Sequence, residues 1–406
     1  MRIGIDARSI LNPEKNPAIG VGHYTFQLIR HLLKLDQRNQ YEIFFDYRVR
    51  QKDIKKFSKP NVKIKYFPWS DYKKYLPGAY SEILGLATLT GKDFDVLHIT
   101  SPDARVPLGY RGKVVCTFQD LAVFKFPKYF SQGRRFKAQY NRKAMATRAD
   151  KLIAVSDNTK NDLIDLFNVP EEKISVIHNA ADKRFLQEMK IDKDQLKDDL
   201  CDRFRIERDY VLFVGTLEPI KNITRLIQAF KLFKDSNKKT GNPRNYQLVL
   251  AGKKGWLAKE YFQIAKDFGL EKDIKFLGYV EGEDLKKLMK GAKLFVMPSL
   301  YEGFGMTVLE ALSCKTPSII SDIDPLRKIA GKSVVYIDSH DIEDIAKKIG
   351  SLIEDHERKS QLARDGFLRA KNFSWEKCAR ETLEIYSAIA QKNNKIVDFD
   401  SRKHTL

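Results

Sequence analysis

Residues 293–312 read KLFVMPSLYEGFGMTVLEAL, and this stretch decides the fold that we predict. KLFVMPS is an apolar run of strand length, LYEGFG is a loop, and MTVLEAL has the apolar spacing of a helix. A helix that starts directly after a buried strand offers free backbone N–H groups to an anion. The stretch therefore predicts a strand–loop–helix unit of a parallel α/β sheet, with a phosphate site in the loop that contains Gly303 and Gly305.

Two carboxylates flank this predicted phosphate site. Glu302 lies in the loop, and Glu310 lies one to two turns inside the helix. A carboxylate can accept hydrogen bonds from two neighbouring hydroxyls, such as those of a ribose or a sugar ring. The alternative is that both are ordinary solvated charges, which is the usual case for two glutamates at this spacing.

Residues 210–230, YVLFVGTLEPIKNITRLIQAF, have the same order of strand, glycine loop and helix. Gly215 lies in the loop, and Asn222 is a candidate N-cap of the helix. Lys221 stands just before this helix start, where its ammonium group would hold a diphosphate and stabilise it as a leaving group. From this segment alone, Lys221 could equally be an ordinary surface lysine.

Strand and helix patterns alternate along the whole chain, which favours parallel sheets covered by helices. We predict an α/β fold of two tandem doubly wound Rossmann-like domains that face across a ligand-binding cleft. The domains cover residues 1–190 and 205–373, the charged segment 190–209 connects them, and a helix at 374–392 packs back on the first domain. The predicted strands are RIGID, YEIFF, VKIKYF, DVLHI, KVVCTF, KLIAVS and ISVIH, then YVLFVG, YQLVLAG, IKFLGYV, KLFVMPS, SIIS and SVVYID.

The composition indicates a globular protein that attracts polyanions. The 406 residues include 73 Lys and Arg against 53 Asp and Glu, which is a formal net charge of +20. The four cysteines are far apart, so we expect reduced thiols and neither a disulfide framework nor a zinc site. Without a signal-peptide pattern or an apolar run of membrane-spanning length, we expect a cytoplasmic protein that can dock on the inner face of the membrane.

The positive charge gathers in two segments of the first domain. Residues 47–80 hold ten Lys or Arg against two acidic residues, and residues 128–151 hold eight against Asp150 alone. Aromatic side chains lie among these cations, a mixture that suits an anionic membrane surface. The alternatives are an ordinary solvated face and a nucleic-acid site; no nucleic-acid recognition motif is present, and we predict no nucleic-acid partner.

Two further segments have candidate ligand groups. Gly20 and Gly22, in NPAIGVGHYTFQL, precede a predicted helix and let the backbone approach a ligand closely. Asp322 and Asp324, in SIISDIDP, follow a predicted strand, where paired carboxylates can hold Mg²⁺ or Mn²⁺ against a diphosphate. We favour a turn or helix cap there, because Lys221 and helix-start amides can neutralise the phosphates. No metal or other cofactor is predicted.

These segments, in this order, resemble the retaining glycosyltransferases of family 4, which have the GT-B fold. The resemblance covers almost the whole chain. It implies a hexosyltransferase with an acceptor-binding first domain and a nucleotide-sugar donor-binding second domain. The matching motifs are RIGIDAR with GVGHYT, KVVCTFQDLAVFKFP, KLIAVSDNTKNDL and ISVIHNAADKRF, then VGTLEPIKN, LVLAGKKGW, IKFLGYV and MPSLYEGFGMTVLEAL.

The resemblance implies a role for each motif residue. Glu302 would bind hydroxyls of the donor sugar, Glu310 the ribose and Lys221 the diphosphate, with Val280 near the base. Gly22 would let the first domain approach the phosphates. The implied donor-binding residues are Gly22, Gln119, Gly215, Thr216, Lys221, Val280, Glu302, Gly303, Phe304, Gly305 and Glu310, and the implied catalytic residues are Glu302, Lys221 and Asp120.

The resemblance also implies the reaction. A hexose would move with retention from a GDP- or UDP-linked sugar to a glycan or lipid-linked acceptor in polysaccharide or cell-envelope biosynthesis, without a metal. GVGHYT and GTLEP are similar to mannosyltransferase-like members, which favours mannose from GDP-mannose. No protein nucleophile is evident, so departure and attack on one face of the sugar is the expected route.

Several residues depart from the family pattern. Gln119-Asp120 stands where the family often has His-Asp, and glutamine cannot act as a base. Thr216 and Ile220 stand where arginines are common, so phosphate binding would depend more on Lys221. These changes motivate an alternative, a catalytically impaired subunit that binds a nucleotide sugar or scaffolds a partner enzyme.

Overall fold

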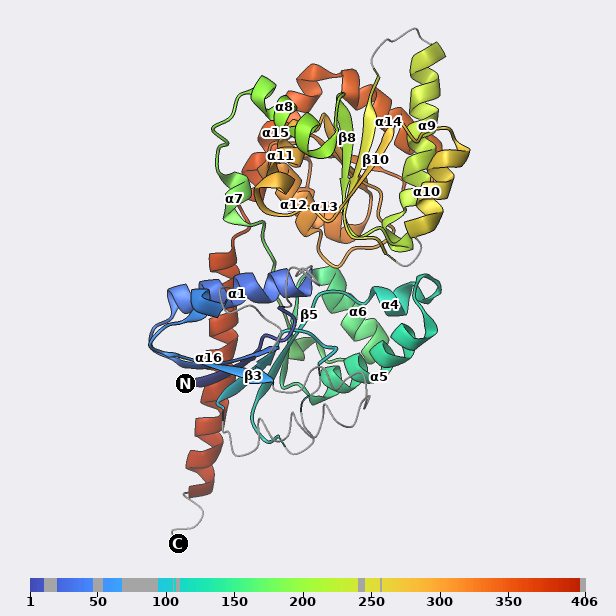
Figure 1. The fold of residues 1–406 in the computed structure, drawn as a ribbon. Coiled ribbons are helices and arrows are strands. Elements are labelled where there is room, and N and C mark those ends of the chain that lie inside the picture. The colour runs from blue at the N-terminus through green and yellow to red at the C-terminus, as the bar shows by residue number, and fades with distance from the viewer. Residues whose placement is uncertain are drawn as a thin grey trace. The chain divides into compact units, whose positions relative to one another are not determined.

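The computed structural model describes residues 1–10, 20–46, 54–67, 94–104, 106, 110–239, 245–255 and 258–401. The chain divides into two compact units (Figure 1). Unit 1 is Met1–Asn179 with Trp375–Leu406, and unit 2 is Ala180–Ser374. Of the basic segment 47–80, residues 47–53 and 68–80 lie outside the described residues.

Unit 1 is built on a seven-stranded parallel sheet in the order β3-β2-β1-β4-β5-β6-β7. The central pairs include Ile3 with Tyr41 and Ile3 with Val96. Its described elements are β1 (Arg2–Asp6), α1 (Val21–Leu35), β2 (Gln40–Asp46), η1 (Lys55–Phe57), β3 (Val62–Phe67), β4 (Val96–Ile99), β5 (Val114–Phe118), α4 (Ala122–Lys125), η3 (Pro127–Tyr129), α5 (Gln132–Arg148), β6 (Lys151–Ala154), α6 (Asp157–Phe167), η4 (Glu171–Lys173), β7 (Ile174–Val176) and α16 (Trp375–Ser401).

Unit 2 is built on a six-stranded parallel sheet in the order β10-β9-β8-β11-β12-β13. Helices lie on both of its faces (Figure 1). Its described elements are α7 (Lys183–Leu186), α8 (Lys193–Phe204), β8 (Tyr210–Val214), η5 (Pro219–Lys221), α9 (Ile223–Lys239), β9 (Gln247–Ala251), α10 (Ala258–Asp267), β10 (Ile274–Gly278), α11 (Gly282–Gly291), β11 (Leu294–Met297), α12 (Met306–Ser313), β12 (Ser318–Ser321), α13 (Asp324–Ala330), β13 (Val335–Ile337), α14 (Ile342–Glu354) and α15 (His356–Ala370).

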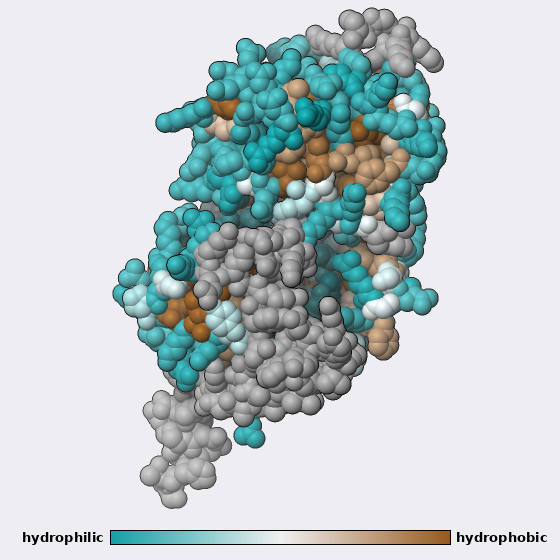
Figure 2. Space-filling view, in the orientation of Figure 1, coloured by the Kyte–Doolittle hydropathy of each residue, from teal (hydrophilic) through white to brown (hydrophobic). Residues whose placement is uncertain are grey.

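The predicted α/β fold class is confirmed in each unit, and every predicted strand is present. The strands form because parallel strands covered on both faces need continuous apolar runs, and every residue of β5, β8 and β9 is buried. The predicted apolar face of α9 is likewise buried in the core of unit 2, through Ile223, Leu226, Ile227 and Phe230. Most of the described surface is hydrophilic in the view of Figure 2, with hydrophobic atoms in small patches.

The segment 190–209 differs from its prediction as a connection between domains. It contains α8, which belongs to unit 2 and packs against α11. Asp192 caps the helix by accepting from the backbone N–H of Gln195 (2.8 Å), and Leu196 and Leu200 are buried. The ion pair of Arg203 with Asp284 (2.7 Å) joins the two helices. The charges that suggested a linker therefore cover the solvent face of a packed helix.

The last helix, α16, belongs to unit 1, where it packs against α1 (Figure 1). Tyr386 contacts Nδ1 of His98 on β4 through its hydroxyl group (2.5 Å), and Nε2 of His98 contacts the hydroxyl of Thr117 on β5 (2.8 Å). Burial lowers the pKa of His98 to about 3, so this ring stays neutral. The helix continues to Ser401, beyond the predicted end at residue 392.

Candidate functional site

Each sheet has one place where the strand order reverses. In unit 2 the chain builds β8, β9 and β10 in one direction and then returns to place β11 beside β8. In unit 1 the same reversal separates β1 from β4. Loops that leave neighbouring strands at such a point diverge to opposite faces of the sheet, which opens a crevice where ligands bind. These two crevices are the candidate sites.

Lys221 and Glu302 meet at the crevice of unit 2. Lys221 ends the turn that follows β8, Glu302 lies in the loop after β11, and Nζ of Lys221 lies 2.6 Å from Oε1 of Glu302. Their side chains are 22% and 11% exposed, so the pair is accessible without being fully solvated. An ammonium group beside a carboxylate at this edge can bind a phosphate and a sugar hydroxyl together.

Three hydrogen bonds fix the loop that carries Lys221. The carbonyl of Ile220 accepts from the backbone N–H of Leu300 (2.9 Å), which ties this loop to the one after β11. Asn222 directly precedes α9, as predicted, but its side chain does not cap the helix. Its amide donates to the carbonyls of Pro298 (3.0 Å) and Ser339 (2.6 Å), which fixes three loops at one point.

Two glycines at this edge of the sheet allow the backbone to pack closely against neighbouring groups. A Cβ on Gly252, which follows β9, would lie 1.7 Å from the carbonyl oxygen of Gly215, so only glycine fits there. Gly305 directly precedes α12 at φ 106°, in the region that favours glycine, and a Cβ there would lie 2.6 Å from Leu326. Phe304 is buried against Phe373, with ring centroids 6.1 Å apart. The turn that aims the first N–H groups of α12 is thus rigid.

Glu310 lies on α12 and is only 8% exposed. Its carboxyl pKa is raised to about 8, chiefly by burial and further by Asp182, although Arg184 opposes the shift. Asp182 and Arg184 form an ion pair (2.8 Å) at the start of α7. No group in the described part of the chain donates a hydrogen bond to the Glu310 carboxylate. Its acceptor capacity is therefore available to a ligand, and the alternative of a solvated helix charge is wrong.

Thr216 and Val280 follow β8 and β10 and are half-buried. Beside Val280, the ring of Tyr279 lies under Nζ of Lys253 (5.9 Å to the centroid), and the Tyr279 hydroxyl donates to Glu281 (3.2 Å). Thr216 thus belongs to the same carboxyl-terminal edge as Lys221. This sheet edge brings together the predicted residues of unit 2: Gly215, Thr216, Lys221, Val280, Glu302, Gly303, Phe304, Gly305 and Glu310.

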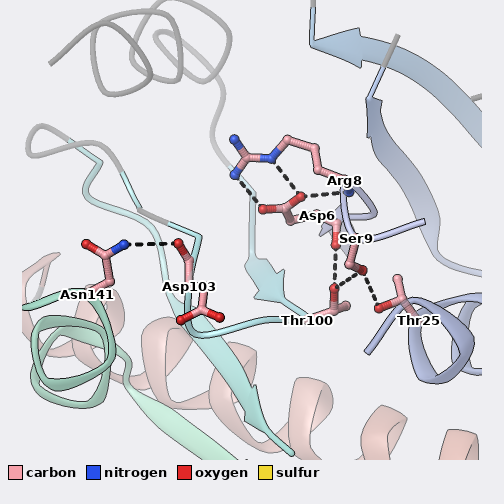
Figure 3. A network of polar contacts seen from close by, with 7 residues as sticks. All are labelled: Asp6, Arg8, Ser9, Thr25, Thr100, Asp103 and Asn141. Carbon is pink, nitrogen blue, oxygen red and sulfur yellow. Dashed lines mark hydrogen bonds and ion pairs between the residues drawn. The ribbon is translucent and has the colours of Figure 1, made fainter. Parts of the chain in front are cut away.

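The crevice of unit 1 contains a polar network that the sequence analysis did not single out (Figure 3). The Arg8 guanidinium donates to both carboxylate oxygens of Asp6, at 2.9 and 2.5 Å. Thr100, after β4, donates to the carbonyl of Asp6 (2.7 Å). Ser9 contacts the hydroxyls of Thr25 (2.8 Å) and Thr100 (3.5 Å). The signal in the sequence is the Asp-x-Arg that begins with the last residue of the first strand.

Gln119 follows β5 and is hydrogen-bonded to Asn179. Nδ2 of Asn179 donates to Oε1 of Gln119 (3.0 Å), and Asn179 is the last residue of unit 1 before the chain enters unit 2. Nε2 of Gln119 and Oδ1 of Asn179 are buried without a hydrogen-bond partner among the described residues. A buried donor and a buried acceptor therefore remain for a ligand or water to satisfy.

Asp120 is tied to α5. Arg142 donates to the Asp120 carbonyl (3.1 Å), lies 3.5 Å from its carboxylate, and forms a two-point ion pair with Asp103 (2.9 and 3.1 Å). Asn141 donates to the carbonyl of Asp103 (3.3 Å), as Figure 3 shows. The loops after β4 and β5 are therefore held together by one guanidinium group.

Two sequence-based expectations concern positions near α1 and α13. Gly20 has φ 55° and directly precedes α1, whereas Gly22 lies inside the first turn of the helix and is buried there. Asp322 pairs with Arg327, and Asp324 begins α13. Among the described residues no group of three or more His, Cys, Asp or Glu could hold a metal ion. Independence from metals stays a prediction.

Comparisons with known proteins concern the sequence and the fold of the whole chain. The sequence model described as "Glycosyltransferase Family 4" matches residues 19–185, and that of "Glycosyl transferases group 1" matches residues 202–369. The chain is 28% identical over 389 residues to the O-antigen chain mannosyltransferase B of Escherichia coli, covering 93% of this chain and 98% of the relative. It is 26% identical to the serotype-specific mannosyltransferase WbdA of the same organism, over 70% of this chain but only 34% of that relative.

Solved structures show the same fold. Anabaena Alr3699/HepE in complex with UDP and glucose is similar with a TM-score of 0.72 at 18% identity, over 96% of this chain and 100% of the other. WaaG, a glycosyltransferase involved in lipopolysaccharide biosynthesis, is similar with a TM-score of 0.70 at 14% identity, over 95% and 99%. The described residues contain no helix long and apolar enough to cross a membrane.

Proposed function

Because this chain belongs to the GT-B glycosyltransferases of family 4 and is mannosyltransferase-like, we propose that it transfers mannose from GDP-mannose with retention of configuration. The acceptor is a growing glycan or a lipid-linked glycan in polysaccharide or cell-envelope biosynthesis. The names of its mannosyltransferase relatives favour this donor sugar and this process. A UDP-linked donor is the alternative, since a structural neighbour holds UDP-glucose.

The ion pair of Lys221 with Glu302 is the observation that carries the proposal. Lys221 Nζ would bind the donor diphosphate, and Glu302 would accept from hydroxyls of the hexose. The sugar–phosphate bond breaks as negative charge builds on the diphosphate, and an ammonium group at that point stabilises the charge. The N–H groups at the start of α12, held by Gly305, add to this stabilisation.

Glu310 would bind the ribose. Its carboxylate has no donor among the described residues, and a ribose offers two neighbouring hydroxyls. Val280 would lie beside the base. Gly22, Gln119 and Asp120 of unit 1 would complete donor binding and catalysis, with Arg142 holding the Asp120 loop.

The acceptor would bind at the crevice of unit 1. Arg8 and Ser9 are half-buried and are held in place by the buried Asp6, Thr25 and Thr100, so their polar groups are suited to sugar hydroxyls. Among the described residues we assign no side chain as a nucleophile that would attack the donor sugar. Departure of the nucleotide and attack of the acceptor on one face of the sugar therefore remain the proposed route, with a donor phosphate oxygen taking the acceptor proton.

The experiment is a thermal-shift panel with GDP, UDP, ADP and their sugar conjugates, followed by product analysis. A ligand that binds only the native state raises the melting temperature. At a ligand concentration of 100 times the Kd, it adds about 2.7 kcal/mol to the free energy of unfolding. We expect the largest shift with GDP-mannose and its loss in Glu310→Ala. Glu357→Ala on α15, an exposed carboxylate, is the matched control and should keep the shift.

The outcomes separate the parts of the proposal. A shift with UDP conjugates alone would replace the donor, and a shift that Glu310→Ala keeps would remove the ribose role. An inverted anomer, seen by NMR as the first product, would contradict retention. If no nucleotide raises the melting temperature of the wild type, the result favours the alternative motivated by Gln119. In that alternative the chain is an impaired subunit that scaffolds a partner enzyme.

A further inference from the structure

Helix α5 presents two large aromatic side chains to solvent. Phe136 is 78% exposed and Tyr140 is 62% exposed, and residues four apart lie on one face of a helix. Phe136 is the most exposed large hydrophobic side chain in the described part of the chain. Single exposed apolar residues are normal on proteins, but two aromatics side by side indicate a contact surface.

The opposite face of α5 fixes the helix to unit 1. Ala138, Asn141, Met145 and Ala146 are buried, and Met145 and Ala146 belong to the core of that unit. The exposed aromatics therefore do not result from a loosely attached helix. The structure holds them outward.

Cations surround these aromatics. The helix contains six Lys or Arg and no acidic residue, and Arg134, Arg135, Lys137 and Lys143 are exposed. The other two cations, Arg142 and Arg148, pair with Asp103 and Asp150 and are not part of this surface. Just before the helix, Lys128 lies over the ring of Tyr129 (5.1 Å to the centroid), and Arg134 lies over Phe130 (4.8 Å). We use the name α5 surface for the two aromatics, Phe136 and Tyr140, together with the four exposed cations of the helix, Arg134, Arg135, Lys137 and Lys143.

We propose that the α5 surface docks on an anionic lipid bilayer, with Phe136 and Tyr140 in the headgroup layer and the cations against lipid phosphates. Aromatic rings favour the membrane–water interface, and cations on the flanks of an apolar strip are attracted to anionic lipids. Exposed aromatics without any acidic neighbour on the helix favour lipid over a nucleic-acid duplex, whose phosphate backbone would need cations alone. The inference goes beyond the proposed function and does not depend on which sugar is transferred.

The test is co-sedimentation of the full chain with vesicles of phosphatidylcholine alone, or of phosphatidylcholine mixed with phosphatidylglycerol. We expect binding to the mixed vesicles that weakens as salt rises. The double variant Phe136→Ser/Tyr140→Ser and the double variant Arg135→Glu/Lys137→Glu should each bind at least about tenfold more weakly. All four side chains are exposed, so unchanged melting temperatures should show that the variants fold.

Matched controls carry the same substitutions elsewhere. Leu368→Ser removes an exposed apolar side chain (61%) on α15, and Lys347→Glu/Lys259→Glu reverses two exposed charges of unit 2. Both should bind vesicles as the wild type does. Equal loss in the controls, equal binding to both vesicle types, or retained binding in both α5 variants would overturn the proposal. Binding to RNA or heparin with no vesicle binding would overturn it in favour of a nucleic-acid surface.

Discussion

Lys221 and Glu302 lie 81 residues apart in the chain, yet Nζ of one is 2.6 Å from Oε1 of the other. The contact exists because β8 and β11, which precede them, are neighbours in the sheet at the point where its strand order reverses. The carboxylate neutralises the lysine, and under the proposed function a diphosphate takes over this role. The pair is therefore a structural link between two loops and, under the proposed function, a charge prepared for a ligand.

Replacing Lys221 with methionine should lower kcat/KM by roughly 10²–10³-fold, because the leaving diphosphate loses its cation. It should also lower the free energy of unfolding by about 1–3 kcal/mol, because Glu302 keeps a poorly hydrated charge without a partner. The measurements are initial rates of nucleotide release and urea unfolding.

A double variant separates the two effects. Lys221→Met/Glu302→Gln removes both charges and should regain most of the stability while staying inactive. Lys231→Met, which breaks an exposed ion pair with Asp235 on α9, should leave the activity unchanged. Wild-type activity in Lys221→Met would contradict the role of the lysine.

The raised pKa of Glu310 makes stability depend on pH. The native carboxyl holds its proton up to about pH 8, whereas the unfolded carboxyl loses it near 4.5. The native state thus binds more protons between these values, and the free energy of unfolding falls as pH rises from about 4.5 to 8. Glu310→Gln should remove this slope and be more stable than the wild type at pH 8, as melting curves at a series of pH values would record.

Nucleotide binding should show the opposite trend. Ribose hydroxyls donate to the ionised carboxylate, so the Kd should decrease as pH rises toward 8 and the carboxyl loses its proton. The neighbours Asp182, Arg184, Tyr279 and Cys314 are unchanged in Glu310→Gln, so titration calorimetry on both proteins isolates the contribution of Glu310. The same pH dependence in both would disprove the assignment.

The sequence predicts the strands well because parallel strands in a covered sheet need continuous apolar runs, as in YVLFV and QLVLA. Lys221 and Glu302 are each predictable from a strand followed by a glycine loop and a helix. Their pairing is not predictable from the periodicity, since it depends on the order of strands in the sheet. The same holds for Asp6 and Thr100, which are 94 residues apart and meet because β1 neighbours β4.

Helix α8 shows a different limit of the sequence. Its residues are mostly charged, and only Leu196 and Leu200 are buried, so the apolar periodicity is too weak to predict a packed helix. The contact with α11 and the cap by Asp192 stabilise it. The surroundings of Glu310 are equally unpredictable from the sequence. Asp182 and Arg184, which lie beside it, come from a distant segment of the chain.

Gln119→His should lower kcat/KM about tenfold or more if glutamine is adapted to its site. Asn179 donates to Oε1 of Gln119, and Nε2 of Gln119 is a buried donor without a partner among the described residues, so an imidazole ring in its place changes both groups. Steady-state rates with the preferred donor provide the measurement. A large gain in rate would instead support the impaired subunit, since it would mean that the family's histidine restores lost catalysis.

Arg142→Met should release the loops after β4 and β5 from each other. The guanidinium is the partner of Asp103 and of the Asp120 carbonyl, so its loss should cost about 1–3 kcal/mol of unfolding free energy. If Asp120 acts in catalysis, kcat should fall while the Kd of the nucleotide changes little, because the proposed donor site lies in unit 2.

The adjacent residue supplies the control for this last change. Lys143 is exposed on the same helix, so Lys143→Met removes a cation without touching Asp103 or Asp120 and should keep both stability and kcat. Arg142→Lys keeps the charge but cannot make the two-point contact with Asp103, and we expect an intermediate kcat. If Arg142→Met and Lys143→Met behave alike, the guanidinium does not position Asp120. Its ion pair with Asp103 would then contribute little to stability or to kcat.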